Sequence, residues 1–304
     1  MKRLFSNKLF HFFVISFLLV SSTSFIIGSG ELLASPDQNQ NLIASFPAND
    51  FSAHAAIVMD SDNNQVLWAK NSDEILYPAS TTKIMTAILA IETVEDLDEV
   101  VTISQNASGR LWSKFAFQPG DKVSMRDLLK AALMISHNGA TIAIAEHISG
   151  SEQEFAKLMN QKAKELGAEN TNFQNSNGLD HNFPSHKSTA EDLALIGSYA
   201  VKNDLFYELV NTVSDSLQII NRDRTIELYN INALISYPNI KGLKTGYTRN
   251  AGHCVVTYSQ KHGKNLVTVL MRSRSSAQRR ADAVRLIDWA SLHYNFQILT
   301  NMLD

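Results

Sequence analysis

Cysteine is nearly absent from this chain, which has one thiol, Cys254, in 304 residues. A single thiol cannot form an internal disulfide, and the neighbouring Val255 and Val256 predict a small buried residue. A catalytic cysteine needs a histidine partner, whereas the adjacent His253 would point to the opposite face of a strand. The scarcity of cysteine therefore excludes an internal disulfide framework and argues against a cysteine hydrolase.

The chain also lacks an excess of positive charge, because it has 27 Lys and Arg residues and 30 Asp and Glu residues, which gives a net charge of −3. Proteins that bind nucleic acids carry clustered cations for the phosphates, so no nucleic-acid partner is expected. The sequence also lacks an H-E-x-x-H pattern and a G-x-S-x-G elbow. We therefore predict no metal, no other cofactor and no Ser-His-Asp hydrolase.

The first thirty residues differ from the rest of the chain. Basic residues in the first eight positions precede an apolar run over residues 9–20. We predict a signal peptide over residues 1–30, cleaved after Gly30, and a polar linker over residues 31–50. Without cleavage, residues 9–27 are long enough to stay as a membrane anchor, which is the only membrane contact we expect. Either outcome predicts export, to the periplasm or to the outer face of the cytoplasmic membrane.

Residues 51–304 are predicted to form one α+β domain. Apolar runs that predict strands occur near both of its ends, at residues 53–59, 65–70, 240–245, 253–259 and 265–271, with hairpin material after Asn221. Capping signatures predict helices that begin at Ser124, Ser151 and Thr189, and a last helix is expected over residues 276–293. We predict one antiparallel sheet built from both ends of the chain and flanked by helices, with a helical insertion at about residues 92–188.

A serine and a lysine stand three residues apart in the stretch YPASTTK, residues 77–83. Pro78 restricts the residue before it, so we expect a helix to begin at about Ala79 or Ser80. Residues three apart share a helix face, which lets Ser80 Oγ meet Lys83 Nζ beside the positive end of the helix. Alone, the pair is ambiguous, because a serine before an apolar helix is more often an N-cap.

Two further motifs follow in chain order. These are Ser136-His137-Asn138, after a predicted helix, and Lys244-Thr245-Gly246, on a predicted strand. With Ser80-x-x-Lys83 they match the three motifs of penicillin-binding proteins and serine β-lactamases. On these motifs, the chain resembles the serine D-alanyl-D-alanine carboxypeptidase family of low-molecular-mass penicillin-binding proteins. The resemblance extends to the stretches at residues 77–86, 119–121, 177–180, 188–193 and 242–248. It implies a β-lactamase/transpeptidase-like fold.

The resemblance implies an acyl-enzyme mechanism in which Ser80 attacks the penultimate carbonyl of the substrate. Lys83 would accept the serine proton, provided that burial beside Lys244 lowers its pKa. Ser136 would pass a proton to the departing D-alanine, and Asn138 would hold Lys83 and the substrate amide.

The resemblance also implies how the substrate is held. Lys244 and Thr245 would line the opposite wall, on an edge strand that takes the substrate backbone as an added strand. Gly246 would permit a close approach. The backbone N–H groups of Ser80 and Tyr247 would form the oxyanion hole.

The implied partners are peptidoglycan stem peptides as substrates and β-lactam antibiotics as covalent inhibitors. Arg279 would lie near the terminal carboxylate of the substrate, with the neighbouring Arg280 as an alternative. The reaction expected from the resemblance is removal of the terminal D-alanine from stem pentapeptides.

Several alternatives stay open. A D,D-endopeptidase would cut peptidoglycan cross-links with the same groups, and a wall-binding module would keep the cleft without turnover. A class A β-lactamase would need a glutamate above the site, but Glu165 and Glu169 are predicted to be solvated. A zinc peptidase would use His181 and His186 near Asp180, where no recognised ligand spacing is present.

The chain departs from the family pattern at the middle motif and near its end. His137 and Gly139 stand where glycine and aspartate are usual. We interpret His137 as a solvent-facing loop residue, the alternative being a titrating group in the cleft. Family members often carry a second β-rich domain, which we do not expect after the helix that contains Trp289.

Overall fold

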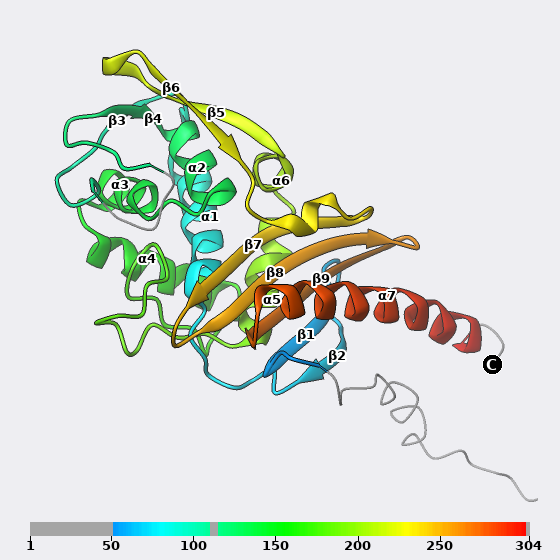
Figure 1. Ribbon diagram of the computed structural model, residues 1–304. Coiled ribbons are helices and arrows are strands. Elements are labelled where there is room, and N and C mark those ends of the chain that lie inside the picture. The colour runs from blue at the N-terminus through cyan, green and yellow to red at the C-terminus, as the bar shows by residue number, and fades with distance from the viewer. Residues whose placement is uncertain (1–50, 110–114, 302–304) are drawn as a thin grey trace, which may run out of the picture.

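The computed structural model describes residues 51–109 and 115–301, and the predicted signal peptide and linker, residues 1–50, lie outside these ranges. A five-stranded antiparallel sheet runs in the order β2-β1-β9-β8-β7 (Figure 1). Its strands are β1 (Ala55–Asp60), β2 (Val66–Lys70), β7 (Ile240–Thr248), β8 (Gly252–Lys261) and β9 (Lys264–Ser273). The predicted sheet from both ends of the chain is confirmed, with β7 at one edge.

Helices cover both faces of this sheet. On one face, α7 (Ser276–Asn301) packs Leu286 and Ile287 against a cluster that contains Val255. On the other face lie α1 (Lys83–Thr93) and α5 (Ala190–Ala200), in a cluster that contains Cys254. Consecutive strand residues point to opposite faces, so the central strands are apolar on both sides. Cys254 is fully buried and burial raises its pKa to about 11, which confirms the predicted structural cysteine.

A block of helices lies above and to the left of the sheet in Figure 1. It contains α2 (Met125–Met134), α3 (Asn138–Ser149), α4 (Glu152–Glu165) and α6 (Asp204–Asn211). The predicted caps are present, since Ser124, Ser151 and Thr189 side chains accept hydrogen bonds from the backbone N–H groups three residues later. Within the described ranges, none of the helices combines the length and hydropathy that a membrane span requires.

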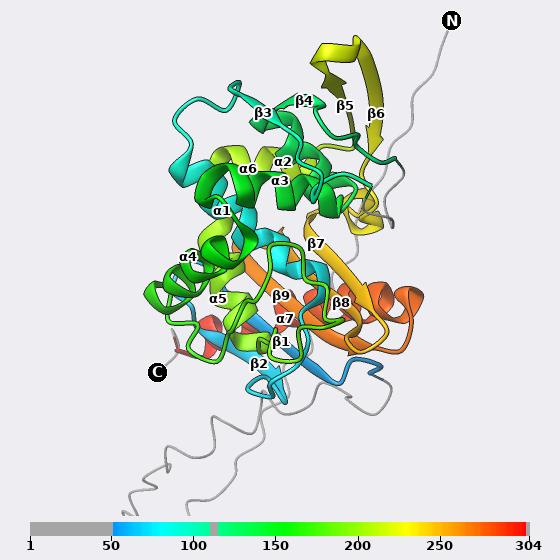
Figure 2. The same cartoon turned by 90° about the vertical axis from the view of Figure 1, so that its left-hand side faces the viewer.

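Two small antiparallel sheets complete the fold. β3 (Val100–Thr102) pairs with β4 (Lys122–Ser124), and β5 (Ser214–Ile219) pairs with β6 (Arg224–Tyr229). The hairpin β5–β6 projects from the helical block, away from the large sheet (Figure 2). The predicted hairpin material after Asn221 is present as β6, but the hairpin begins earlier, at β5, whose polar first residues hide its buried Leu217 and Ile219.

Candidate active site

Ser80 lies in a 3₁₀ turn, Ala79–Thr82, directly before α1. The predicted helix start at about Ala79 or Ser80 is confirmed, although the first turn is 3₁₀ and the α-helical part begins at Lys83. The hydroxyls of Thr81 and Thr82 donate to the carbonyl oxygens of Pro78 and Ala79, at 2.7 and 2.8 Å, and such hydroxyl bonds compete with the regular helix pattern. Lys83 is the first residue of α1, and its side chain still reaches back to Ser80.

A buried histidine, His186, is hydrogen-bonded to this turn. Ala79 has a positive φ of 50°, which costs a residue with a Cβ roughly 1–2 kcal/mol. Gly178 leaves space for the Ala79 carbonyl in this conformation, because a Cβ at position 178 would overlap that carbonyl. The backbone N–H of Gln174 donates to His186 Nδ1 at 3.0 Å, so Nε2 carries the proton and donates to Thr82 Oγ1 at 2.8 Å. Burial lowers the pKa of His186 to about 3, with a smaller effect from Lys83, and keeps the ring neutral.

The Lys83 amine is held by three oxygens. Its Nζ lies 3.1 Å from Ser80 Oγ, 2.7 Å from Asn138 Oδ1 and 2.6 Å from the carbonyl oxygen of Asn177. The side chain is 0% exposed. Burial first, and then the charge of Lys244, lower the pKa of Lys83 well below its ordinary value.

The chemistry of a neutral amine fits these partners. Such an amine has two N–H groups and one lone pair, whereas the asparagine oxygens can only accept. Charged Lys83 donates to all three oxygens, whereas a neutral Lys83 that keeps its N–H bonds to Asn138 Oδ1 and the Asn177 carbonyl would turn its lone pair toward the Ser80 hydroxyl. The arrangement can therefore receive a proton from Ser80.

Glu152 completes the network, although the sequence predicted it only as part of a helix cap. Its Oε1 accepts hydrogen bonds from Ser176 Oγ at 2.6 Å and from Asn177 Nδ2 at 3.2 Å. These bonds tie the loop that carries the Asn177 carbonyl to the start of α4. The negative charge of Glu152 also opposes part of the lowering of the Lys83 pKa. Glu165 and Glu169 are exposed, as predicted.

The middle motif links α2 to α3. Asn138 begins α3, and the partly exposed Ser136 has a positive φ of 60°. Ser136 makes no hydrogen bond to Ser80 or Lys83 in the described structure. Its role in proton transfer stays a prediction.

Both interpretations of His137 are wrong, because the ring is buried. It packs against Phe115 and Phe117 with ring centroids 4.6 and 4.7 Å away. Nδ1 accepts from the backbone N–H of Ala140, so Nε2 carries the proton and donates to the Phe115 carbonyl at 3.0 Å. Burial lowers the pKa of His137 to about 4, so it is a neutral cap of α3.

The edge strand β7 forms the opposite wall. Lys244 is 1% exposed, and burial followed by the charge of Arg279 lowers its pKa to about 7. A Cβ at Gly246 would lie 2.9 Å from the backbone nitrogen of Ser80, so only glycine lets the strand come this close. The structure thus brings the Lys-Thr-Gly motif against the turn that carries the serine.

Arg279 and Tyr247 lie at different depths on this wall. Arg279, on α7, donates from Nη1 to the carbonyl of Cys254 at 3.1 Å, and Cys254 is the register partner of Gly246. Arg280 shows no resolved contact with the motif. The Tyr247 side chain is 60% exposed and stacks on His253, with ring centroids 4.4 Å apart. Of these side chains, Arg279 is the one that the structure holds against the strand behind the motif.

The zinc alternative would need His181 and His186 in one site. Among residues 51–109 and 115–301, no group of three or more His, Cys, Asp or Glu side chains is placed to hold an ion. His181 is exposed, whereas His186 is buried beneath the Ser80 turn. The two histidines of the zinc alternative are therefore in different environments.

Comparison with known proteins decides the family. Residues 40–275 match the sequence model of a peptidase family described as D-alanyl-D-alanine carboxypeptidase. The chain belongs to the D-alanyl-D-alanine carboxypeptidase family. The resemblance seen in its motifs is confirmed.

Individual relatives of the family show the same similarity. The chain is 36% identical over 247 residues to D-alanyl-D-alanine carboxypeptidase DacF of Bacillus subtilis, covering 80% of this chain and 63% of that protein. It is 32% identical over 244 residues to a D-alanyl-D-alanine endopeptidase of Pseudomonas aeruginosa, covering 79% and 77%. The chain thus spans less than two thirds of the length of the first relative.

The fold is similar to solved structures. The crystal structure of the Streptomyces K15 DD-transpeptidase superposes with a TM-score of 0.74 at 28% identity, covering 79% of this chain and 97% of that one. The predicted α+β, transpeptidase-like fold is confirmed.

Proposed function

We propose that this protein is a serine D,D-carboxypeptidase that removes the terminal D-alanine from peptidoglycan stem pentapeptides. The observation that carries the proposal is the contact of Ser80 Oγ with a buried lysine whose other partners only accept hydrogen bonds. Family membership adds the substrate class, because the family is described by this activity.

Acylation would start when Ser80 Oγ attacks the carbonyl of the penultimate D-alanine and Lys83 Nζ takes the hydroxyl proton. The tetrahedral oxyanion would accept hydrogen bonds from the backbone N–H groups of Ser80 and Tyr247. The C–N bond then breaks as the proton on Lys83 Nζ is relayed through the Ser136 hydroxyl to the nitrogen of the leaving D-alanine, which leaves Lys83 neutral and Ser136 protonated. Water hydrolyses the ester of Ser80, which restores the hydroxyl.

The substrate would lie along the free edge of β7. That edge has unpaired backbone groups, since β8 pairs only with its other side. An extended peptide added to it would place the terminal carboxylate near Thr245 and the cations of Lys244 and Arg279. A bound carboxylate would also stabilise the charged form of Lys244, whose pKa is about 7 without one.

The same chemistry implies inhibition by β-lactams, which would acylate Ser80 in place of the peptide. The proposed organisation is a signal peptide over residues 1–30, a linker over 31–50 and the catalytic domain over 51–304. We propose export to the periplasm or to the outer face of the cytoplasmic membrane, with membrane contact through the N-terminal segment if it is not cleaved.

The second candidate is a D,D-endopeptidase, favoured by the similarity to an endopeptidase of Pseudomonas aeruginosa that the chain covers over 77% of its length. The test incubates the purified protein with a pentapeptide muropeptide and, separately, with a cross-linked dimer. Free D-alanine and released monomer are measured. We expect D-alanine from the pentapeptide as the faster reaction. Monomer release without D-alanine would contradict the carboxypeptidase proposal and support the endopeptidase.

A further inference from the structure

A second polar hollow lies beside the candidate active site, between the segment that leads to Ser80 and the turn that joins β7 to β8. Its volume is about 390 Å³, within the range of small-ligand pockets. Its lining includes Glu74, Tyr77, Lys187, Arg249, Ala251 and Arg272. None of these side chains has a part in the mechanism above.

Cations outnumber carboxylates in this hollow, with Lys187, Arg249 and Arg272 against Glu74. The Glu74 carboxylate is already engaged, 2.6 Å from His54 Nε2. The Lys187 ammonium lies over the ring of Tyr77. In the described part of the chain, no Asp or Glu forms an ion pair with any of the three cations. The hollow therefore presents unneutralised positive charge.

A β-bulge places one of these cations. Between the register pairs His253 with Ser273 and Val255 with Leu270, one residue of β8 faces two residues of β9, and Arg272 is one of the two. Arg272 has a positive φ of 55°, which residues with a Cβ rarely adopt. Bulges redirect side chains, and such strain concentrates at functional sites.

The direction of β7 relates the hollow to the substrate. Along β7, Thr245 comes first, Gly246 lies against the Ser80 nitrogen, and Arg249 follows directly after the strand. A peptide paired antiparallel to β7, with its terminal carboxylate near Thr245, would run backwards toward Arg249. An extended peptide advances roughly 3.3 Å per residue. Residues two or three positions before the scissile bond thus come level with the hollow.

We infer that this hollow is a subsite for a carboxylate of the acyl donor, carried by an acidic residue upstream of D-alanyl-D-alanine. This inference rests on the proposed function. Guanidinium groups bind carboxylates through paired, charge-assisted hydrogen bonds, and Arg249 and Arg272 supply two of them from different strand ends. Lys187 adds a point charge at the side nearest Tyr77. The subsite selects stem peptides by charge.

The test uses two peptides of the form acetyl-γ-D-glutamyl-lysyl-D-alanyl-D-alanine, one with a free α-carboxylate on the glutamyl residue and one with this group amidated. The ratio of their kcat/KM values is measured from released D-alanine. The wild-type protein should favour the free carboxylate by about 10-fold, and the preference should shrink as salt is raised. In Arg249→Gln/Arg272→Gln the ratio should fall to within about 2-fold of one, with an intermediate value in Arg249→Gln. The matched control Arg224→Gln, on β6 and outside the hollow, should keep the wild-type ratio.

Each outcome decides a different point. Equal kcat/KM for the two peptides in the wild type, or a preference that survives in the double variant, overturns the subsite and leaves the proposed function standing. Turnover of neither peptide by the wild type overturns the proposed function and the subsite with it. Labelling by a fluorescent penicillin reports that each variant is folded.

Discussion

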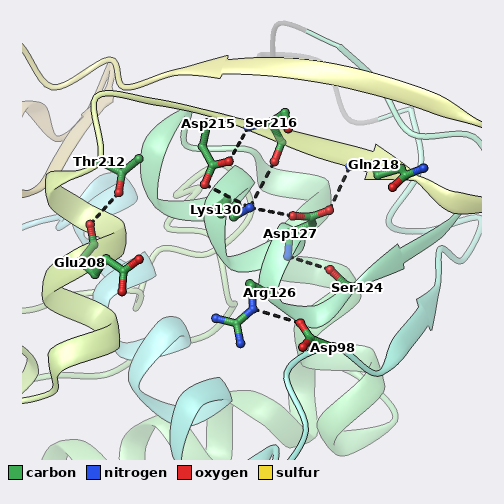
Figure 3. A network of polar contacts seen from close by, with 10 residues as sticks. All are labelled: Asp98, Ser124, Arg126, Asp127, Lys130, Glu208, Thr212, Asp215, Ser216 and Gln218. Carbon is green, nitrogen blue, oxygen red and sulfur yellow. Dashed lines mark hydrogen bonds and ion pairs between the residues drawn. The ribbon is translucent and has the colours of Figure 1, made fainter.

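Two lysines on neighbouring helices have opposite electrostatic surroundings. Lys83, at the start of α1, contacts only the oxygens of a serine and two asparagines. Lys130, on α2, lies 3.2 Å from Asp127 and 3.1 Å from Asp215 (Figure 3). Burial disfavours the charged form of both. At Lys130, the hydrogen bond to Asp215 and the two carboxylate charges outweigh burial and raise the pKa, whereas the pKa of Lys83 is lowered.

The difference teaches that the partners of a lysine decide whether it acts as a cation or as a base. Asp127 belongs to α2 and Asp215 to β5, so the charge of Lys130 joins the projecting hairpin to the helical block. No carboxylate contacts Lys83 within the described residues, and we propose that it accepts the proton of Ser80. Predictions that exchange or remove these lysines test this contrast.

The largest effect is expected from Lys83→Met, which keeps the volume and removes the amine. Acylation of the protein by a fluorescent penicillin should slow by about 10³-fold, because Ser80 loses its base. Lys130→Met is the matched control and should stay within about 2-fold of the wild-type rate, since it lies outside the candidate site. Rapid acylation of Lys83→Met would show that Lys83 is not the base that activates Ser80.

Lys244, another buried lysine without a carboxylate contact, extends the comparison to pH. Its folded pKa of about 7 lies below the ordinary 10.5, so between these values the unfolded chain binds a proton that the folded protein does not. This group therefore makes the free energy of unfolding rise with pH, by at most about 1.4 kcal/mol per pH unit. In urea titrations from pH 7.5 to 9.5, the stability of Lys244→Met minus that of the wild type should decrease. Parallel stability curves would show that Lys244 stays charged.

The free energy of unfolding should respond to the two substitutions in the opposite way from activity. Lys83→Met should lose activity but gain stability, whereas Lys130→Met should keep activity and lose stability. Lys130→Met should lower the free energy of unfolding by about 1–2 kcal/mol, because two partly buried carboxylates lose their cation. Lys83→Met should raise it by about 1–2 kcal/mol at neutral pH, because folding no longer has to bury and neutralise an amine. Urea unfolding of both variants measures these changes. A Lys130→Met variant more stable than the wild type would contradict the interpretation that the ion pairs of Lys130 in Figure 3 stabilise the fold.

The smallest change in the free energy of unfolding is expected from a substitution of Arg126, which lies on the same helix as Lys130. Arg126 Nε lies 3.0 Å from Asp98 Oδ1, but the Asp98 side chain is 73% exposed. Arg126→Gln should therefore change the free energy of unfolding by less than about 0.5 kcal/mol in the same urea assay. A loss as large as that of Lys130→Met would mean that exposure does not distinguish the two ion pairs.

The large sheet was predictable because its central strands are apolar on both faces and lie between turn residues. β5 was not, because its first three residues are polar and only Leu217 and Ile219 are fully buried. The helix start at about Ala79 was predictable, but its 3₁₀ first turn was not, because the threonine hydroxyls after Ser80 bond back to carbonyl groups. Strand periodicity is visible in sequence, whereas such local competition depends on the folded turn.

The candidate site was predictable as far as its motifs reach. Ser80, Lys83 and Asn138 are brought together as expected. Asn177 lies in a stretch that the resemblance includes, but the bond from its backbone carbonyl to Lys83 was not predicted, because every residue has a carbonyl group. The burial of His137 depends on phenylalanines twenty or more residues earlier in the chain. Groups that act through the backbone, or through packing across the fold, are the ones that sequence could not supply.

The most direct test of the central claim is to locate the covalent adduct by mass spectrometry after reaction with benzylpenicillin. The adduct should map to the peptide that contains Ser80. It should be absent from Ser80→Ala and retained in the matched control Ser236→Ala, an exposed serine outside the candidate site. An adduct on another residue such as Ser136, or one that persists in Ser80→Ala, would contradict the assignment of Ser80 as the nucleophile activated by Lys83.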